Sequence, residues 1–251
     1  MKVAPPQPPD LRNDNWALFL DIDGTLLEHA AHPDDVVVGA ELRDLLVALN
    51  DCLGGALAFV TGRSVAAVDH LFAPLRLRAA GLYGLEHRLE PEGPVTAADE
   101  PADIAALARE LEAEFAGQNV YIERKGPILA VHTRAAPHLL ARSIELVEQA
   151  LDSLPDGYRA LPGNAGVELM PLEAAKGAAI RRFMAMSPFR GRRPVFLGDD
   201  TSDENGFEAI NEAGGLSVRV RPDGATIAQY SVANVADAFA WLSRFEHVNR
   251  S

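Results

Sequence analysis

Short apolar runs that end in polar residues alternate with helical patterns along most of this 251-residue chain. Residues 16–22 (WALFLDI) and 55–61 (GALAFVT) are such runs, and residues 39–50 between them place leucines at helical spacing. The pattern returns late in the chain, at residues 194–200 and 216–220. Such runs are typical of strands covered on both faces. Strands alternating with helices predict an α/β fold with a doubly wound, Rossmann-like parallel sheet. Its functional sites should lie at the carboxyl ends of the strands.

The middle of the chain has a different pattern, which predicts an inserted α+β domain. A helix rich in Ala, Leu and Glu at residues 100–115 precedes two strands with a Lys-Gly-Pro turn at residues 121–134. A second amphipathic helix, residues 136–154, precedes a hairpin at residues 158–170. This unit would interrupt the parallel sheet as a cap. The predicted divisions are a Pro-rich tail at 1–13, a core of 14–87 and 169–251, and a cap at 88–168.

Composition narrows the class of protein. The chain has 23 Lys+Arg against 36 Asp+Glu, a formal charge of −13, which argues against partners such as nucleic acid or an acidic membrane surface. Cys52 is the single cysteine, so an internal disulfide framework and a cysteine-rich zinc site are excluded. No apolar run reaches the roughly 20 residues that span a bilayer, and the first residues lack an apolar signal core. We therefore expect a cytoplasmic protein that acts on a small molecule, with a monomer favoured for want of any oligomerisation signal.

Two carboxylates, Asp21 and Asp23, follow the first predicted strand, and Gly24 after them permits a tight turn. An ordinary Asp-Gly turn would explain this pattern equally well. However, two acids at the end of a buried strand repel each other and lose solvation. A bound cation would relieve both costs, and oxygen ligands suit Mg²⁺.

Two further positions have the residue types of a phosphate site. Thr61 follows the second strand, within Thr61-Gly62-Arg63-Ser64, where a hydroxyl and the N–H groups of a helix start could hold a phosphate. Plain N-capping by Thr61 or Ser64 is the favoured interpretation of that segment alone. Lys176, in EAAKGAAI, is a single helical lysine of a kind that is usually solvated. The small residues around it leave room for another group to approach.

A fourth cluster follows the strand PVFL, where Asp199, Asp200, Asp203 and Glu204 lie within six residues. So many acids at a strand end would be costly without a metal ion. An EF-hand calcium loop is the competing interpretation, because the spacing nearly fits. Thr201 stands where that loop needs its first Asp, and no helix precedes it, so we disfavour this alternative.

Taken in this order, DIDGT, a strand-end Thr, an isolated Lys and GDD-xx-D resemble the haloacid dehalogenase superfamily of phosphohydrolases. The resemblance implies that Asp21 is the nucleophile that attacks phosphorus and that Asp23 is the general acid/base. It implies that Thr61 and Lys176 hold phosphoryl oxygens. A carboxylate about 4 Å from a phosphate charge is repelled by roughly 4 kcal/mol at an effective dielectric near 20. Such a site therefore needs positive charge, from Lys176 and from a metal ion.

The same resemblance implies a Mg²⁺ site. Its ligands would be the Asp21 carboxylate, the main-chain carbonyl of Asp23 and Asp199, with Asp200 and Asp203 supporting them. Both histidines of the loop after the first motif, His29 and His32, are interpreted as ordinary polar loop residues and not as metal ligands.

Polar side chains on otherwise apolar strands distinguish the predicted cap. Glu123 and Lys125 have i, i+2 spacing, as do His132 and Arg134, so each pair shares one strand face. With Glu168 they suit a ligand that carries many hydroxyl groups. An ion-pair ladder on an exposed sheet face would give the same spacing.

The segments GALAFVTGRS, GLYGLEHR, IERKGPILAVHTR, GVELMP and VFLGDDTSDENGF resemble the trehalose-6-phosphate phosphatases. The resemblance covers the chain from about Trp16 to Trp241. It implies that the five cap residues contact the sugar and that Arg63 assists near the phosphate. It also implies that the substrate is the sugar phosphate trehalose 6-phosphate, which would be hydrolysed to trehalose and phosphate. Ser202 replaces the usual Thr of the last motif, and Asn164 stands where a basic residue is frequent, so Asn164 is left unassigned.

Two alternatives stay open at this point. One is another sugar-phosphate phosphatase of the same superfamily, acting for example on sucrose phosphate or mannosylglycerate phosphate. The other is a non-catalytic phospho-receiver, which is also doubly wound and acidic but lacks a DxDGT pair and an inserted cap.

Overall fold

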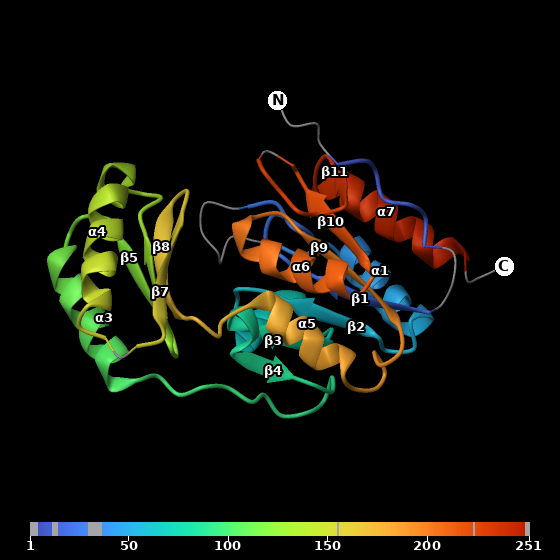
Figure 1. Ribbon diagram of the computed structural model, residues 1–251, viewed down its shortest axis with the longest axis horizontal. Helices are drawn as coiled ribbons and strands as arrows, with labels where there is room; N and C mark the ends of the chain where they lie inside the picture. Colours follow the sequence, from blue (N-terminus) through green and yellow to red (C-terminus); the bar gives the residue numbers. More distant parts are fainter. Residues whose placement is uncertain (1–4, 12–14, 30–36, 155, 223, 249–251) are drawn as a thin grey trace. The chain divides into compact units, whose positions relative to one another are not determined.

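The computed structural model describes residues 5–11, 15–29, 37–154, 156–222 and 224–248 (Figure 1). Its contacts divide the chain into two compact units: the residues up to Thr96 with those from Ala175 onward, and Ala97–Ala174. The second unit starts and ends later than the cap expected at 88–168. The physical reason is strand pairing: β4 (Glu86–Arg88) pairs with β3 (Arg78–Gly81) of the first unit, whereas β8 (Gly166–Pro171) pairs within the second.

A seven-stranded sheet forms the first unit, in the order β11-β10-β9-β1-β2-β3-β4. Its neighbouring strands are parallel, apart from the antiparallel pair β3 and β4. The chain order reverses direction at β1 and β9, the switch point of a doubly wound sheet, and the predicted α/β core is confirmed. The other strands are β1 (Trp16–Leu20), β2 (Leu57–Val60), β9 (Arg193–Gly198), β10 (Leu216–Val220) and β11 (Tyr230–Val232).

Helices cover both faces of this sheet. Helices α1 and α7 contact each other, and so do α5 and α6 (Figure 1). The crossover β1-α1-β2 runs across the sheet in one direction and β9-α6-β10 in the other, so right-handed crossovers place α1 and α6 on opposite faces. The helices are α1 (Ala40–Cys52), α2 (Val65–Phe72), α5 (Lys176–Met184), α6 (Glu204–Glu212) and α7 (Val235–Val248), with 3₁₀ turns η2 (Leu82–Gly84) and η4 (Thr201–Asp203).

The central strands are apolar throughout because both of their faces are covered. All five residues of β1 and all four of β2 are buried. The ring of Phe19 in β1 lies 6.0 Å from that of Phe183 in α5 and 5.3 Å from that of Phe189. On β2, Phe59 lies 4.6 Å from Phe72 of α2. This packing makes the sheet a rigid base for the polar residues that follow the strands.

The second unit is a four-stranded antiparallel sheet in the order β5-β6-β8-β7, with two helices against one face (Figure 1). The two predicted hairpins therefore join into one sheet, because β6 pairs with β8. Its apolar core includes Leu111 of α3, Val147 of α4 and three strand residues, Leu129, Val131 and Val167. Its elements are α3 (Ala102–Glu114), β5 (Tyr121–Lys125), β6 (Ile128–His132), α4 (Leu140–Leu151), β7 (Tyr158–Gly163) and β8.

The described part of the Pro-rich segment, residues 5–11, packs on the first unit. The N–H of Ser231 in β11 donates to the carbonyl of Pro6 (2.8 Å), and the Trp241 indole N–H donates to that of Pro9 (3.0 Å). Leu11 is buried. Proline carbonyls can accept such bonds although proline has no N–H to donate. Among the described residues, none of the helices has the length and apolar character to cross a membrane.

Candidate active site

The paired strands β1 and β9 bring two of the acidic motifs together. Leu20 pairs with Leu197, and the N–H of Asp21 donates to the Leu197 carbonyl (3.0 Å). The loop then turns at Gly24, whose φ is +77° and where a Cβ would lie 2.0 Å from Asp199 Oδ2. Both facts require glycine at that position. Asp21 is buried, and the Thr25 hydroxyl donates to Asp21 Oδ2 (3.3 Å).

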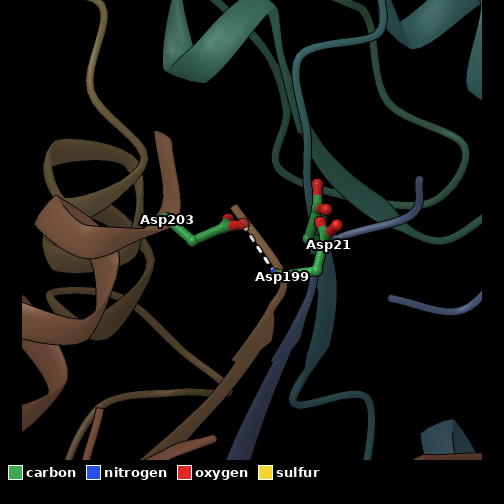
Figure 2. A group of neighbouring side chains, drawn as sticks. All are labelled: Asp21, Asp199 and Asp203. Carbon is green, nitrogen blue, oxygen red and sulfur yellow. Dashed lines mark hydrogen bonds between the residues drawn. The ribbon is translucent and has the colours of Figure 1, made fainter. Parts of the chain in front are cut away.

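Three carboxylates meet at this edge of the sheet. Oxygens of Asp21, Asp199 and Asp203 lie within 4.8 Å of one another, so this group could hold a metal ion. Figure 2 shows Asp203 reaching across from its own turn, with a hydrogen bond from the Asp199 N–H to Asp203 Oδ2 (2.9 Å). The N–H of Asp200 also donates to Asp203 Oδ2 (3.0 Å). Asp203 thus organises the loop that carries Asp199.

Lys176 is the first residue of α5 and is buried, unlike the solvated lysine that its sequence alone would suggest. Its Nζ donates to Asp21 Oδ1 (2.7 Å) and to Asp203 Oδ1 (2.6 Å). Burial by itself would lower the pKa of Lys176, but the two carboxylates outweigh burial and raise it. The ammonium therefore stays charged and links residues that lie 155 and 27 positions away in the sequence.

The charges in this cluster do not balance. Three carboxylates and one ammonium sum to −3 + 1 = −2 when all are ionised. Burial raises the pKa of Asp21 and that of Asp203, and neighbouring carboxylates add to the shift. Both shifts mean that the site favours extra positive charge. A divalent cation with oxygen ligands fits this donor set.

Asp23 and Thr61 lie beside this cluster in the first unit. The guanidinium of Arg63 makes a two-pronged contact with Asp23, with Nε–Oδ2 and Nη2–Oδ1 distances of 2.7 Å each. Thr61 is buried, and its hydroxyl oxygen accepts from the Arg63 N–H (3.2 Å). Ser64 caps α2 by accepting from the Ala67 N–H (3.2 Å). The segment therefore contains the N-cap that the sequence suggested. It also contains the guanidinium of Arg63, which is the positive partner of the Asp23 carboxylate.

Two further residues have contacts that sequence reasoning did not assign. Asp200 is exposed, and its carboxylate accepts from the Ser202 N–H (2.6 Å) as the N-cap of η4. His29 was interpreted as an ordinary loop residue, yet its Nε2 lies 3.1 Å from Asp199 Oδ2, and this hydrogen bond raises the pKa of His29. No spacing signal in the sequence pointed to this contact. His32 lies outside the described residues.

Four of the five polar cap residues form one cluster on the second unit. Lys125 Nζ lies 2.8 Å from Glu168 Oε1 and 3.5 Å from Glu123 Oε2, and His132 Nε2 lies 2.8 Å from Glu123 Oε2. The register places Glu123 and Glu168 opposite Ala130 on its two neighbouring strands, so these side chains share one face. Arg134 lies exposed in the turn beyond β6.

The charges of this cluster are largely paired among themselves. Glu168 and Glu123 raise the pKa of Lys125 although burial opposes them. For Glu123, burial by itself would raise the pKa, but His132 and Lys125 outweigh burial and lower it. The opposite face carries the apolar residues that pack on the helices. Asn164 is exposed in the turn between β7 and β8.

Comparison with known proteins identifies the family. A family model described as trehalose-phosphatase matches residues 19–236. The chain belongs to the trehalose-phosphatase family. Relatives include a probable trehalose-phosphate phosphatase of Sinorhizobium fredii, 45% identical over 83% of this chain and 79% of the relative. The trehalose-6-phosphate phosphatase of Escherichia coli is 38% identical over 90% of this chain and 85% of the relative.

Solved structures agree on the fold of this family member. The C-terminal domain of Candida albicans trehalose-6-phosphate phosphatase has a TM-score of 0.81 at 17% identity, over 93% of this chain and 92% of that one. A trehalose-6-phosphate phosphatase related protein has a TM-score of 0.71 at 23% identity, over 93% and 98% of the two chains. The α/β fold predicted from the sequence is thus shared with these structures.

Proposed function

We propose that this protein hydrolyses trehalose 6-phosphate to trehalose and inorganic phosphate through an aspartyl-phosphate on Asp21. The observation that carries the proposal is the buried cluster in which Lys176 and Thr25 hold both oxygens of the Asp21 carboxylate. A nucleophile has to be fixed in this way to approach phosphorus in line with the leaving group. Membership of the trehalose-phosphatase family supports the choice of substrate.

In the proposed reaction, a carboxylate oxygen of Asp21 attacks phosphorus while the bond from phosphorus to the sugar oxygen breaks. Asp23 donates a proton to that departing oxygen. Water then attacks the phosphorus of the aspartyl-phosphate, Asp23 takes a proton from this water, and Asp21 is released with phosphate. Lys176 and the Thr61 hydroxyl would bind phosphoryl oxygens and stabilise their charge in the transition state.

Arg63 holds Asp23 in place for this role. Both carboxylate oxygens of Asp23 accept hydrogen bonds from the Arg63 guanidinium. Opening one of these bonds would free an oxygen of Asp23 to carry a proton to the sugar oxygen. A phosphate group that enters the site would compete for the same guanidinium, because Arg pairs with phosphate as well as with carboxylate. Substrate binding and the release of Asp23 would then be coupled.

The cofactor that we propose is Mg²⁺. The Asp21 and Asp199 carboxylates would hold it together with the main-chain carbonyl of Asp23, and Asp203 and Asp200 would support the ligand loop. The formal charge of −2 on the buried cluster supports a divalent ion. When bound, Mg²⁺ neutralises charge between the nucleophile and the phosphoryl group.

We propose that the polar cluster of the second unit recognises the disaccharide. Lys125, Glu123, His132 and Glu168 offer charged donors and acceptors on one face of the sheet, which suits sugar hydroxyl groups. Arg134, in the turn beyond β6, would add a further donor. These side chains already pair with one another. A sugar hydroxyl that replaced one of the contacts would therefore still leave each charged group with a hydrogen-bond partner.

A substrate panel tests the proposed function. Phosphate release from trehalose 6-phosphate, sucrose phosphate, glucose 6-phosphate and an aryl phosphate should be measured with Mg²⁺ and with chelator. We expect trehalose 6-phosphate to have the highest kcat/KM and chelator to abolish turnover. Equal turnover of several sugar phosphates would refute the disaccharide assignment.

The nucleophile can be tested with Asp21→Asn. The amide cannot form an acyl phosphate by the same attack, so turnover should be lost while the protein still folds. Asp237→Asn, an exposed position on α7, is the matched control and should keep the normal rate. Normal turnover of Asp21→Asn would show that another group attacks phosphorus.

Sugar recognition can be tested with Lys125→Ala. We expect a higher KM for trehalose 6-phosphate and little change for a small aryl phosphate, which lacks the disaccharide. The control is Arg124→Ala, because Arg124 pairs instead with Glu100, Nη2–Oε2 2.7 Å. If Lys125→Ala affected both substrates equally, Lys125 would have no role in recognising the sugar.

A further inference from the structure

The turn η2, which follows β3, has a backbone conformation that its residues disfavour. Leu82 and Tyr83 have φ values of +49° and +56°, and Gly84 follows at +98°. A single left-handed residue with a bulky side chain is rare, because its Cβ crowds the following carbonyl. Two in succession persist only where neighbouring structure holds them, and such positions gather at functional sites.

Hydrogen bonds hold this turn against the loop that carries Thr61 and Arg63. The N–H of Leu82 donates to the Arg63 carbonyl (2.9 Å), and the N–H of Tyr83 donates to the Thr61 carbonyl (3.0 Å). A Cβ at Gly81 would lie 2.7 Å from the Arg63 carbonyl oxygen, so the two segments are in close contact. The turn and the loop form one backbone assembly.

The strained backbone places the Tyr83 ring between two parts of the site. A Cβ at Gly62 would lie 2.6 Å from the Tyr83 hydroxyl oxygen, so the ring edge covers the loop beside Thr61. The Nζ of Lys176 lies over the same ring, 5.8 Å from its centroid. An ammonium at this distance from an aromatic face is attracted by the ring.

We propose that Tyr83 is a positioning residue for Lys176 and forms a wall of the phosphoryl pocket between Lys176 and the Thr61 loop. This inference rests on the proposed function. A lysine side chain has several rotatable bonds, and the Lys176 contacts with Asp21 and Asp203 must be shared once a phosphoryl oxygen approaches Nζ. The ring gives the ammonium a contact that does not compete with the phosphoryl group, so Nζ stays in place during transfer.

The test compares variants that keep or remove the ring. Tyr83→Phe keeps the aromatic face, whereas Tyr83→Asn and Tyr83→Gly remove it with residues that tolerate left-handed backbone. We expect the two ring-free variants to melt at or above the wild-type temperature, because backbone strain is relieved. Their kcat/KM should nevertheless fall about 10-fold, equally for trehalose 6-phosphate and for an aryl phosphate. Tyr83→Phe should keep most of the activity.

A second readout separates this inference from the proposed function. Binding of inorganic phosphate in the presence of Mg²⁺, measured by calorimetry, needs no turnover and no sugar. It should weaken about 10-fold in the ring-free variants and little in Tyr83→Phe. Ring-free variants with wild-type phosphate affinity and kcat/KM would overturn the inference, and so would a Tyr83→Phe variant that loses as much as Tyr83→Asn. If wild-type protein binds phosphate but fails to hydrolyse trehalose 6-phosphate, only the proposed function is refuted.

Discussion

Replacing Lys176 with methionine should destabilise the metal-free protein more than the loss of any surface charge. The Lys176 ammonium donates to Asp21 and Asp203 at 2.7 and 2.6 Å, and all three side chains are buried. At about 2.7 Å and an effective dielectric near 20, each contact corresponds to roughly 6 kcal/mol of gross Coulomb attraction. Desolvation offsets most of this energy. Removing one partner of a buried ion pair typically costs about 3–5 kcal/mol, and that is the loss expected for Lys176→Met.

The assay is equilibrium unfolding by denaturant at neutral pH, with a chelator present so that no cation replaces the ammonium. The matched control is Arg181→Met on the same helix, because Arg181 makes an exposed ion pair with Glu212 (2.7 Å). Such surface pairs contribute at most about 1 kcal/mol. The double variant Lys176→Met/Asp203→Asn should recover part of the loss, because it removes one of the unpaired carboxylates.

Each comparison has an outcome that would refute the reasoning. If Lys176→Met lost less than about 1 kcal/mol, as expected of Arg181→Met, the buried cluster would not depend on its ammonium. If the double variant were as unstable as Lys176→Met alone, uncompensated negative charge would not be the cause of the loss. A loss of activity without a loss of stability would place the importance of Lys176 in catalysis only.

Three further measurements check other parts of the structure. Mg²⁺ at about 100 times its dissociation constant should raise the free energy of unfolding by about 2.7 kcal/mol, and Asp199→Asn should reduce this gain; an equal gain in both proteins would exclude Asp199 as a ligand. Burial, aided by Arg182, lowers the pKa of His87, so below about pH 6.5 the unfolded chain binds a proton that the folded one does not. Stability should therefore fall with decreasing pH less steeply in His87→Leu than in wild type, and parallel curves would contradict this. Gly177→Ala would bring a Cβ within 2.3 Å of the Asn205 carbonyl oxygen, so a loss of about 1–3 kcal/mol is expected; unchanged thermal unfolding would show that the α5–α6 contact can shift freely.

Positions that follow strands directly could be predicted from the sequence. Asp21, Thr61 and Asp199 come at the ends of apolar runs, and the carboxyl ends of parallel strands lie along one edge of a sheet. The spacing of apolar runs in the sequence therefore indicated which polar residues would lie at the same edge of the sheet. The same reasoning placed Glu123 and Lys125 on one strand face, and in the structure Lys125 Nζ lies 3.5 Å from Glu123 Oε2. Strand alternation fixes the face on which a side chain lies, whatever the loops do.

Contacts that depend on loops could not be predicted in this way. The burial of Lys176, the pairing of Arg63 with Asp23 and the contact of His29 with Asp199 all join segments whose paths no periodicity describes. The short strand β4 was missed because three residues are too few to show alternation. Arg134 shows the reverse error: i, i+2 spacing placed it on a strand face, but β6 ends at His132.

The hydrogen bonds of the acidic cluster also indicate how its three carboxylates would divide their roles. Asp203 Oδ1 accepts from Lys176, and Asp203 Oδ2 accepts from the N–H groups of Asp199 and Asp200. Direct metal binding by Asp203 would have to compete with buried hydrogen bonds that are costly to leave unmade. Among the described residues, the hydrogen bond seen at the Asp199 side chain is its contact with the exposed His29. That bond can open to solvent. We therefore infer that a cation would bind the Asp199 carboxylate most directly, whereas binding by Asp21 would have to displace its Lys176 or Thr25 contact. Asp203 would instead fix the loop and the ammonium around it.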